Sequence, residues 1–204
     1  TFESKITQTA RNISLSLTEQ AVSRRNLLVN SDFARNGGFY ISTAFKATME
    51  RLSGYENSNC FHFMPTGTGS YPVLRWDGVN SACNNIPIVE GKKYTISCWA
   101  KVSNTNAPLY VKVFGQKAIT GNVETTTAAT GTILDKVVTL NSANTWQLVS
   151  FTFVASGGYS YCSVRLFFRP ETNTRIDGYI CRPMLEQSDS YNGWTLSEDD
   201  YDYR

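Results

Sequence analysis

Two hydrophobic periodicities divide the chain near residue 25. Through the first segment apolar side chains recur at spacings of three and four, which is the period of one helical face: Phe2, Ile6, Ala10, Ile13 and Leu17. Residues 13–17 also alternate apolar and small polar side chains, as a half-buried strand does, so helix and strand compete there. We expect a short helix to about residue 12, followed by an extended segment.

A helix this short is only marginally stable in water, so its apolar stripe needs a partner. The partner is either the body of this domain or the same segment of sister chains, and we favour sister chains. Residues 1–25 are therefore predicted to be a linker that joins subunits.

From residue 26 the dominant period is two, and clusters of Gly, Pro, Asn and Ser separate the apolar runs. Eight runs are typical of strands: residues 26–33, 60–64, 73–76, 92–102, 109–115, 145–155, 161–170 and 175–186. No convincing helix lies between them, which favours an all-β antiparallel sandwich of about eight strands over alternating βαβ units. Residues 119–145, rich in Thr, Ala, Asn and Gly, are compatible with an extended hairpin or a long loop.

Composition agrees with one large β domain that has appendages at both ends. The chain has 204 residues, 18% of them charged and 13% aromatic, with a net charge of +2, which excludes a disordered polyelectrolyte and a basic nucleic-acid binder. No apolar run is long enough to span a membrane, and no segment resembles a signal peptide. Because the sequence begins with Thr, we expect it to be part of a longer polypeptide.

The ends of the domain follow from these patterns. The strand-forming body covers residues 26–186, and residues 187–204 form an acidic segment that we expect to be solvated. Trp194 in that segment is expected to pack against the sandwich and anchor it.

The cysteines are odd in number and have no short paired spacing: Cys60, Cys83, Cys98, Cys162 and Cys181. Three of them fall within strand-like apolar runs, where a free thiol acts as a small hydrophobe. This pattern indicates reduced thiols in a protein made in a reducing cytosol. It also lacks the CxxC spacing of a zinc site.

Several segments resemble a known family. The order of "NLLVNSDF" before a Gly pair, then "VEGKKYTISCWAKV", then "TWQLVSFTF", resembles jelly-roll carbohydrate-binding modules of the family 4, 9 and 22 type, over about residues 26–196. The closing "PMLEQSDSYNGWTLSEDD" and the leading "ESKITQTARNISLSLTEQAVSRRNLL" resemble the segments that flank such modules in bacteriophage and prophage tail and minor structural proteins.

The resemblance implies a non-catalytic binding module of a phage tail-associated protein that contacts bacterial cell-surface glycans during host adhesion. It implies a protein synthesised in the bacterial host cytoplasm and located in the virion tail. The partners that it implies are a bacterial surface polysaccharide, other tail subunits and further copies of the chain, a trimer in many such proteins, with no nucleic acid and no membrane.

Alternation along three strands predicts which side chains could contact a sugar. Aliphatic residues of residues 94–102, 109–114 and 161–169 share the core face, and the opposite face is aromatic and basic. The candidate ligand-binding residues on that face are Trp99, Lys101, Tyr110, Lys112, Phe114, Tyr161, Arg165 and Phe167.

The resemblance places these three strands in one sheet, whose concave outer surface often holds the sugar. Aromatic rings stack on the C–H face of a pyranose, and cationic side chains hydrogen-bond its hydroxyl groups. The alternative is that a loop or a sister subunit covers the same face.

Catalysis has little support in the sequence. His62 is the one histidine, no serine has a Gly-x-Ser-x-Gly elbow, and no pattern selects a pair of carboxylates as a glycosidase needs. We therefore predict that the protein is not an enzyme. The rival interpretations are a purely structural spacer or oligomerisation domain without sugar binding, and a small hydrolase.

The resemblance also implies a structural calcium ion between the first and last strands, and it points to Asp32 and Asp177 as ligands. Calcium takes about six to eight oxygen ligands. The family usually has an acidic residue just after the Phe of the first-strand motif, and this chain has Ala34 there.

Overall fold

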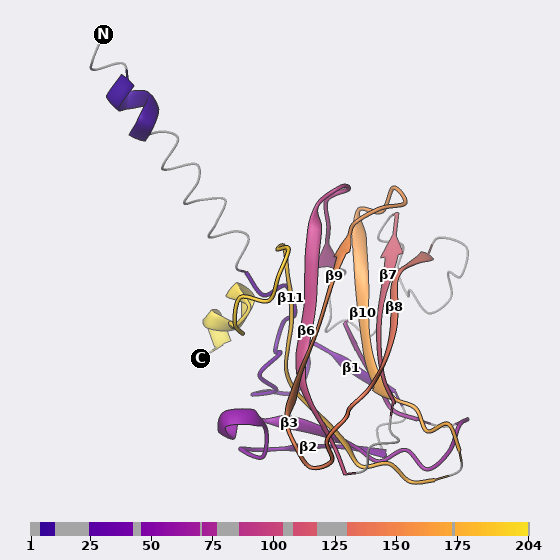
Figure 1. The fold of residues 1–204 in the computed structure, drawn as a ribbon. Coiled ribbons are helices and arrows are strands. Elements are labelled where there is room, and N and C mark those ends of the chain that lie inside the picture. The colour runs from indigo at the N-terminus through magenta and orange to yellow at the C-terminus, as the bar shows by residue number, and fades with distance from the viewer. Residues whose placement is uncertain are drawn as a thin grey trace.

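The computed structural model describes residues 5–10, 25–42, 46–69, 71–76, 86–103, 108–117, 130–172 and 174–203, and these form a sandwich of two antiparallel sheets (Figure 1). Residues 5–10 are helical, which confirms the middle of the predicted N-terminal helix. Two short 3₁₀ helices follow, η2 (Tyr55–Asn57) and η4 (Glu198–Tyr203). None of the helices in these ranges is long and apolar enough to cross a membrane.

The first sheet, which we call sheet A, has the strand order β1-β4-β10-β7-β8, and β5 also pairs with β10. Its strands are β1 (Tyr40–Ser42), β4 (Val73–Trp76), β5 (Ile86–Pro87), β7 (Pro108–Gln116), β8 (Thr130–Thr139) and β10 (Tyr161–Phe168). The pairing of β7 with β10 is the longest uninterrupted ladder of this sheet. On its other side, β10 pairs with β4.

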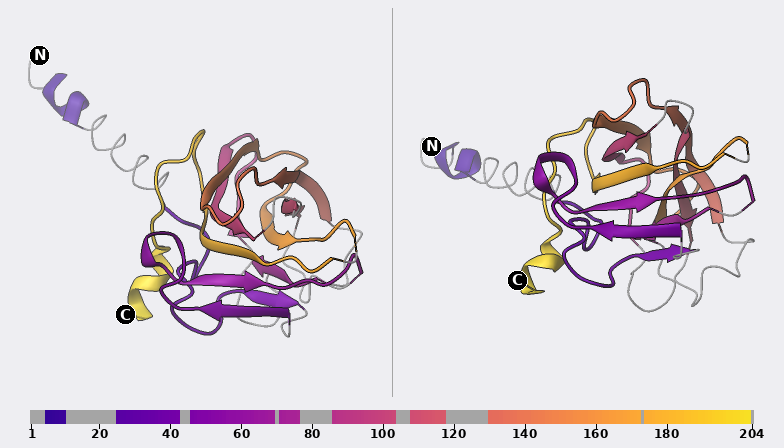
Figure 2. Two further views of the ribbon diagram at one scale, coloured as in Figure 1. Left: turned by 60° about the horizontal axis from the view of Figure 1, so that its bottom comes forward. Right: turned by 90° about the horizontal axis from the view of Figure 1, so that it is seen from below.

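The second sheet, sheet B, has the order β2-β3-β11-β6-β9. Its strands are β2 (Ala47–Glu50), β3 (Cys60–Phe63), β6 (Lys93–Val102), β9 (Gln147–Val154) and β11 (Gly178–Glu186). Except for the consecutive strands β2–β3, β4–β5 and β7–β8, each strand is followed along the chain by one in the other sheet, so the chain crosses the sandwich repeatedly, and the two sheets curve around a common interior (Figure 2). The predicted jelly-roll sandwich is thus confirmed, with eleven strands in the described part.

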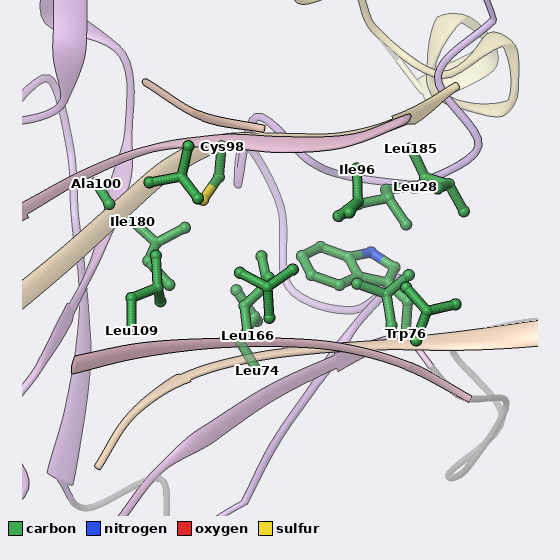
Figure 3. Close-up of a cluster of buried hydrophobic side chains, with 14 of the residues drawn as sticks. Leu28, Leu74, Trp76, Ile96, Cys98, Ala100, Leu109, Leu166, Ile180 and Leu185 are labelled. Atoms are coloured by element: carbon green, nitrogen blue, oxygen red, sulfur yellow. The ribbon is translucent and has the colours of Figure 1, made fainter. Parts of the chain in front are cut away.

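The core forms where the inner faces of the two sheets meet (Figure 3). The alternation predicted for three strands is confirmed, because the residues assigned to their core faces are all buried: Tyr94, Ile96, Cys98, Ala100 and Val102 on β6; Leu109, Val111 and Val113 on β7; Cys162, Val164, Leu166 and Phe168 on β10. Trp76 of β4 lies among them and donates its indole N–H to the carbonyl of Val29 at 2.9 Å.

The segment expected to be the first strand, residues 26–33, is a series of turns instead. Leu28 and Phe33 are fully buried as a strand would require, but Asn30 and Phe33 have φ near +54°, which ends any extended run. The physical reason is that Asn and Ser side chains bond to nearby backbone groups and compete with strand pairing. Asn30, for example, donates its amide to the carbonyls of Arg35 and Gly37.

Four strands were not predicted, namely β1, β2, β5 and β8. The first three have only two to four residues, too few for a period to stand out. β8 resolves part of the ambiguous stretch 119–145, since residues 130–139 pair with β7 and residues 118–129 lie outside the described ranges.

The acidic C-terminal segment is tied to the sandwich at particular residues, so the expectation of a solvated segment holds only in part. Asp189, Glu198 and Asp199 are exposed. Asp200 is almost fully buried, and its carboxylate accepts the backbone N–H of Asn30 and pairs with Arg35 at 2.8 Å. Burial raises the pKa of Asp200, although these two partners oppose the rise. Trp194 donates to the hydroxyl of Ser31 at 3.3 Å, which confirms that it anchors the segment.

Asn26 joins the start of the domain to its end. Its side-chain oxygen accepts the backbone N–H groups of Leu28 at 3.0 Å and Leu185 at 3.3 Å, and its amide donates to Ser31 and to the carbonyl of Thr195. One buried side chain therefore connects the entry turn, β11 and the C-terminal segment.

We predict that Asn26→Ala lowers the free energy of unfolding by about 2–4 kcal/mol, because it leaves two buried backbone N–H groups without an acceptor. Chemical denaturation measures the change. Asn36→Ala, an exposed asparagine of the same region, is the control and should change stability little. Equal stabilities of the two variants would contradict the role of Asn26.

Cys60, Cys98, Cys162 and Cys181 are free and buried, as the sequence indicated, and Cys83 lies outside the described residues. Burial raises the pKa of Cys60 to about 12 and also raises the pKa of the other three thiols. The thiolate is the reactive form of cysteine, so two effects keep these side chains unreactive in the folded protein: reagents cannot reach them, and the thiols stay protonated.

In a Cys83→Ser variant, we predict that the folded protein reacts with a thiol reagent only at its global unfolding rate, and that urea-unfolded protein reacts with all four remaining thiols at once. Absorbance of the released thiol product follows the reaction. Rapid modification of the folded variant would show that at least one of these cysteines is accessible.

Candidate functional site

The eight predicted ligand-binding residues lie on two different sheets. Tyr110, Lys112 and Phe114 of β7 lie in sheet A, with Tyr161, Arg165 and Phe167 of β10, whereas Trp99 and Lys101 of β6 belong to sheet B. The prediction of one groove built by all three strands is therefore wrong. Alternation correctly assigned the outer face of each strand, but it carries no information about which sheet a strand joins.

Trp99 is covered by the chain itself. The ring of Tyr55 in η2 stacks on its indole with centroids 3.6 Å apart and planes within 7°. The Arg182 guanidinium then lies 5.6 Å from the centroid of Tyr55 and 5.6 Å from that of Trp194. For Trp99, the alternative that another part of the protein covers the outer face is therefore correct. Tyr55 occupies a side of the indole on which a sugar would have to stack.

Lys101 takes part in a row of side chains across the outer face of sheet B. Its ammonium lies 4.4 Å from the centroid of Tyr179 and 4.9 Å from that of Trp146. The imidazole of His62 stacks on the other side of the row, with its centroid 4.2 Å from that of Tyr179.

His62 is held between two carboxylates. Nδ1 lies 2.8 Å from Glu50 and Nε2 lies 2.8 Å from Asp177. Both ring nitrogens must donate if both contacts are hydrogen bonds, so within the described residues neither nitrogen serves a serine or cysteine nucleophile.

The two predicted calcium ligands do not form one site. Asp177 accepts hydrogen bonds from His62 and Arg175 and lies just before Gly178, which pairs with Phe63 at the end of β3. Asp32 contacts Asn59 through its carbonyl oxygen, just before the start of β3. The pair is thus separated by the length of that strand, and this part of the prediction is wrong.

The surroundings of Asp177 also favour an ion pair over a metal. Burial alone would raise its pKa, but the hydrogen bonds from Arg175 and His62 lower the pKa below its usual value. In the described ranges, no group of three or more His, Cys, Asp or Glu side chains is placed to hold a metal ion.

The outer face of sheet A has two neighbouring rows of side chains, of which the first is in register across five strands. We call the first the charged row, and it consists of Tyr40, Arg75, Arg165, Lys112 and Asp135, from β1, β4, β10, β7 and β8. The Arg165 guanidinium lies 4.7 Å from the centroid of Phe114, and that of Arg75 lies 5.5 Å from the centroid of Tyr40. Lys112 pairs with Asp135 at 2.9 Å.

The second row, which we call the ring row, consists of Tyr71, Phe167 and Tyr110. The ring of Phe167 stacks between the two tyrosines, at centroid distances of 5.2 Å and 4.9 Å and with planes within 15° and 7°. Only 6% of Phe167 is exposed, and Val137 of β8, opposite Tyr110, is 53% exposed. Its two neighbours cover Phe167, so the accessible apolar surface beside the charged row is that of Tyr71, Tyr110 and Val137.

Two buried polar side chains lie at the other end of the same face. Gln116 of β7 and Ser163 of β10 are 2% and 1% exposed, and within the described part of the chain neither the amide atoms of Gln116 nor the hydroxyl of Ser163 has a hydrogen-bond partner. Buried polar groups in folded proteins are normally paired with protein or water. Both side chains lie beneath the surface, so a ligand on this face would not reach them without a rearrangement.

Sequence reasoning missed Arg75, Tyr40, Tyr71, Gln116 and Ser163. The run at residues 73–76 was recognised as a strand, and its alternation places Arg75 opposite the core residues Leu74 and Trp76, so the signal was present. Tyr40 and Tyr71 lie in or beside elements too short to predict. Nothing in the sequence distinguishes Gln116 and Ser163 from other polar strand residues.

Comparison with known structures supports the sandwich. The TmCBM61 module in complex with beta-1,4-galactotriose has 10% identity and a TM-score of 0.53, with 80% of this chain and 99% of that chain covered. A structure that describes the promiscuous specificity of carbohydrate-binding modules of the β-sandwich superfamily has 14% identity and a TM-score of 0.50, with 81% and 63% covered.

A phage protein shares the fold as well. The enzymatically active domain of tailspike protein 4 of bacteriophage CBA120 has 13% identity and a TM-score of 0.50, with 80% of this chain and 21% of that chain covered. At these identities the likeness concerns the fold alone. No curated protein matches the chain in sequence.

The sequence itself identifies the family. Residues 25–173 match the family model described as carbohydrate binding domain, CBM_4_9, which confirms the resemblance noted for the strand motifs. Since this match spans most of the sandwich, the chain belongs to the CBM_4_9 carbohydrate binding domain family.

Proposed function

We propose that the outer face of sheet A binds a glycan, and that the protein is a non-catalytic module of a phage tail-associated protein that contacts bacterial surface glycans. The observation that carries the proposal is the pairing of the ring row with the charged row on one face. Six of the eight residues selected from the sequence lie on this face.

The two rows match the two kinds of surface that a sugar presents. Tyr110 and Lys112 are two residues apart on β7, as are Phe167 and Arg165 on β10, so the rows run side by side about 7 Å apart. The partly exposed rings of Tyr71 and Tyr110 can receive the C–H face of a pyranose, and the neighbouring cations can donate to its oxygen atoms.

The absence of catalysis is part of the proposal. Glycoside hydrolysis uses two carboxyl groups on either side of the scissile bond. In the described strands of sheet A the outer face carries one carboxylate, that of Asp135, and Lys112 holds it in an ion pair. The family match and the sugar-binding modules of similar fold also support a binding role.

The tail context is supported by the flanking sequences. The segments before residue 26 and after residue 183 resemble those that flank such modules in phage tail proteins, and the fold is one that a phage tailspike domain also has. Adhesion to the host surface would use the glycan-binding face of sheet A.

We predict that Tyr110→Ala weakens glycan binding at least tenfold, or about 1.4 kcal/mol, because it removes the outer ring of the ring row. An array of bacterial surface polysaccharides identifies a ligand, and calorimetry measures its affinity. Tyr201→Ala, at a 61% exposed tyrosine of η4, is the matched control. If no glycan binds and the chain self-associates through the face of sheet A instead, the structural-spacer interpretation is correct.

We further propose that residues 1–24 join copies of the chain. Light scattering should give a multiple of the chain mass for the whole chain and a monomer after removal of these residues. Arg25 should be retained, because it forms ion pairs with Glu198 and Asp199 at the end of the domain. An unchanged mass after the deletion would show that the contacts between copies lie elsewhere.

A further inference from the structure

We propose that Cys60 and Cys181 form a redox site, in which a disulfide between the two thiols links β3 to β11 when the surroundings are oxidising. The two cysteines come from distant parts of the sequence, and the fold brings them together on sheet B. In the structure both thiols are free, so the reduced form of the site is the one observed.

Cys60 and Cys181 lie directly opposite each other on neighbouring antiparallel strands. They form the last of the four residue pairs in the ladder between β3 and β11, which begins with Phe63 and Gly178. Opposed residues of an antiparallel pair have Cα atoms about 4.5 or about 5.5 Å apart, depending on the hydrogen-bond pattern. Both separations lie within the range of about 4.4–6.8 Å that disulfides span. The backbone therefore needs no large movement to accept the bond.

Both side chains lie on the outer face of sheet B. Directly opposed residues share a face, and His62, two residues after Cys60, contributes its ring to the outer row of this sheet. On the other strand, Sγ of Cys181 accepts the backbone N–H of Tyr55 at 3.2 Å, and Tyr55 covers this same face. Neither cysteine is part of the apolar cluster between the sheets. The two thiols thus point the same way, as a disulfide requires.

The other described cysteines are not placed for such a bond. Cys98 of β6 and Cys162 of β10 both belong to the apolar cluster, and their strands are in different sheets. Packed sheets lie about 10 Å apart, which is beyond the reach of a disulfide. Cys98 also faces away from Cys181, which is paired with the neighbouring residue Trp99. Among the described thiols, the fold therefore selects one pair for crosslinking.

The loop around η2 decides when the bond can form. It covers Cys181, because Tyr55 bonds to the sulfur and a Cβ at Gly54 would lie 3.0 Å from the Cβ of Cys181. Burial, followed by the charges of Glu50 and of a Cys181 thiolate, raises the pKa of Cys60 to about 12. Little thiolate is therefore present in the folded protein. We expect oxidation to occur while the chain folds, before this loop packs.

A small disulfide such as oxidised glutathione is the oxidant. The thiolate of one cysteine attacks it and forms a mixed disulfide, which releases the first molecule of reduced glutathione. The second cysteine then attacks the protein sulfur of the mixed disulfide and releases the second molecule. The two protein thiols are oxidised, the glutathione disulfide is reduced, and both protons end on glutathione.

The bond fixes the centre of sheet B. β11 is the middle strand of this sheet, and β3 pairs directly with it. The two cysteines are about 120 residues apart in the sequence, and a crosslink that closes so long a loop restricts the unfolded chain strongly. Because the bond is reversible, the domain is more stable in oxidising than in reducing surroundings.

The Cys83→Ser variant tests the proposal, because it keeps only the four cysteines that the structure describes. Thiols titrated in urea should number four after refolding with reduced glutathione and two after refolding with oxidised glutathione. The mass of the oxidised chain should fall by two hydrogen atoms, and the unreduced peptides that contain Cys60 and Cys181 should be linked. Its melting temperature should rise by at least about 5 °C.

Serine substitutions in the same background separate this pair from the other thiols. Cys60→Ser and Cys181→Ser should each keep three thiols after oxidation, whereas Cys98→Ser and Cys162→Ser should each fall from three to one. Four thiols in the oxidised Cys83→Ser protein, or a linked peptide that contains Cys98 or Cys162, would overturn the proposal. An unchanged melting temperature of the linked protein would overturn its stabilising effect.

Discussion

The antiparallel ladder between β7 and β10 is the constraint on which the rest of this structure depends. Its eight residue pairs run without interruption from Tyr161 and Gln116 to Phe168 and Leu109. On its inner face it supplies aliphatic side chains to the core, and on its outer face it supplies the centre of both rows. A slip of one residue would exchange the two faces, so the apolar core fixes the register and thereby the site.

The two outer faces of the sandwich have different tasks. The face of sheet B contacts other segments of the same chain. Tyr55 stacks on Trp99, and the hydroxyl groups of Thr95 and Thr152 donate to the carbonyls of Ser188 and Asp189, respectively. The C-terminal segment after residue 189 is held by Trp194, which donates to Ser31. The aromatic and charged groups of this face are therefore matched to partners within the chain. Ligand binding is better suited to sheet A, whose cations are gathered in one row.

The local pattern of the sequence was sufficient to predict strands and their faces. On β6, β7 and β10 every residue assigned to the core is buried, because alternation is a property of each strand alone. Sheet membership could not be predicted in this way. Sheet membership depends on where the chain crosses the sandwich. Because the prediction assigned β6 to the same sheet as β7, it wrongly placed Trp99 beside Tyr110.

The other errors also arise from long-range contacts. Residues 26–33 have strand-like apolar positions, but Asn26 and Asn30 bond to partners at the far end of the chain and hold the segment in turns. The burial of Asp200 in the acidic tail could not be predicted, because its partners Asn30 and Arg35 are about 170 residues away in sequence. Charge composition predicts solvation only when no distant segment supplies the opposite charge.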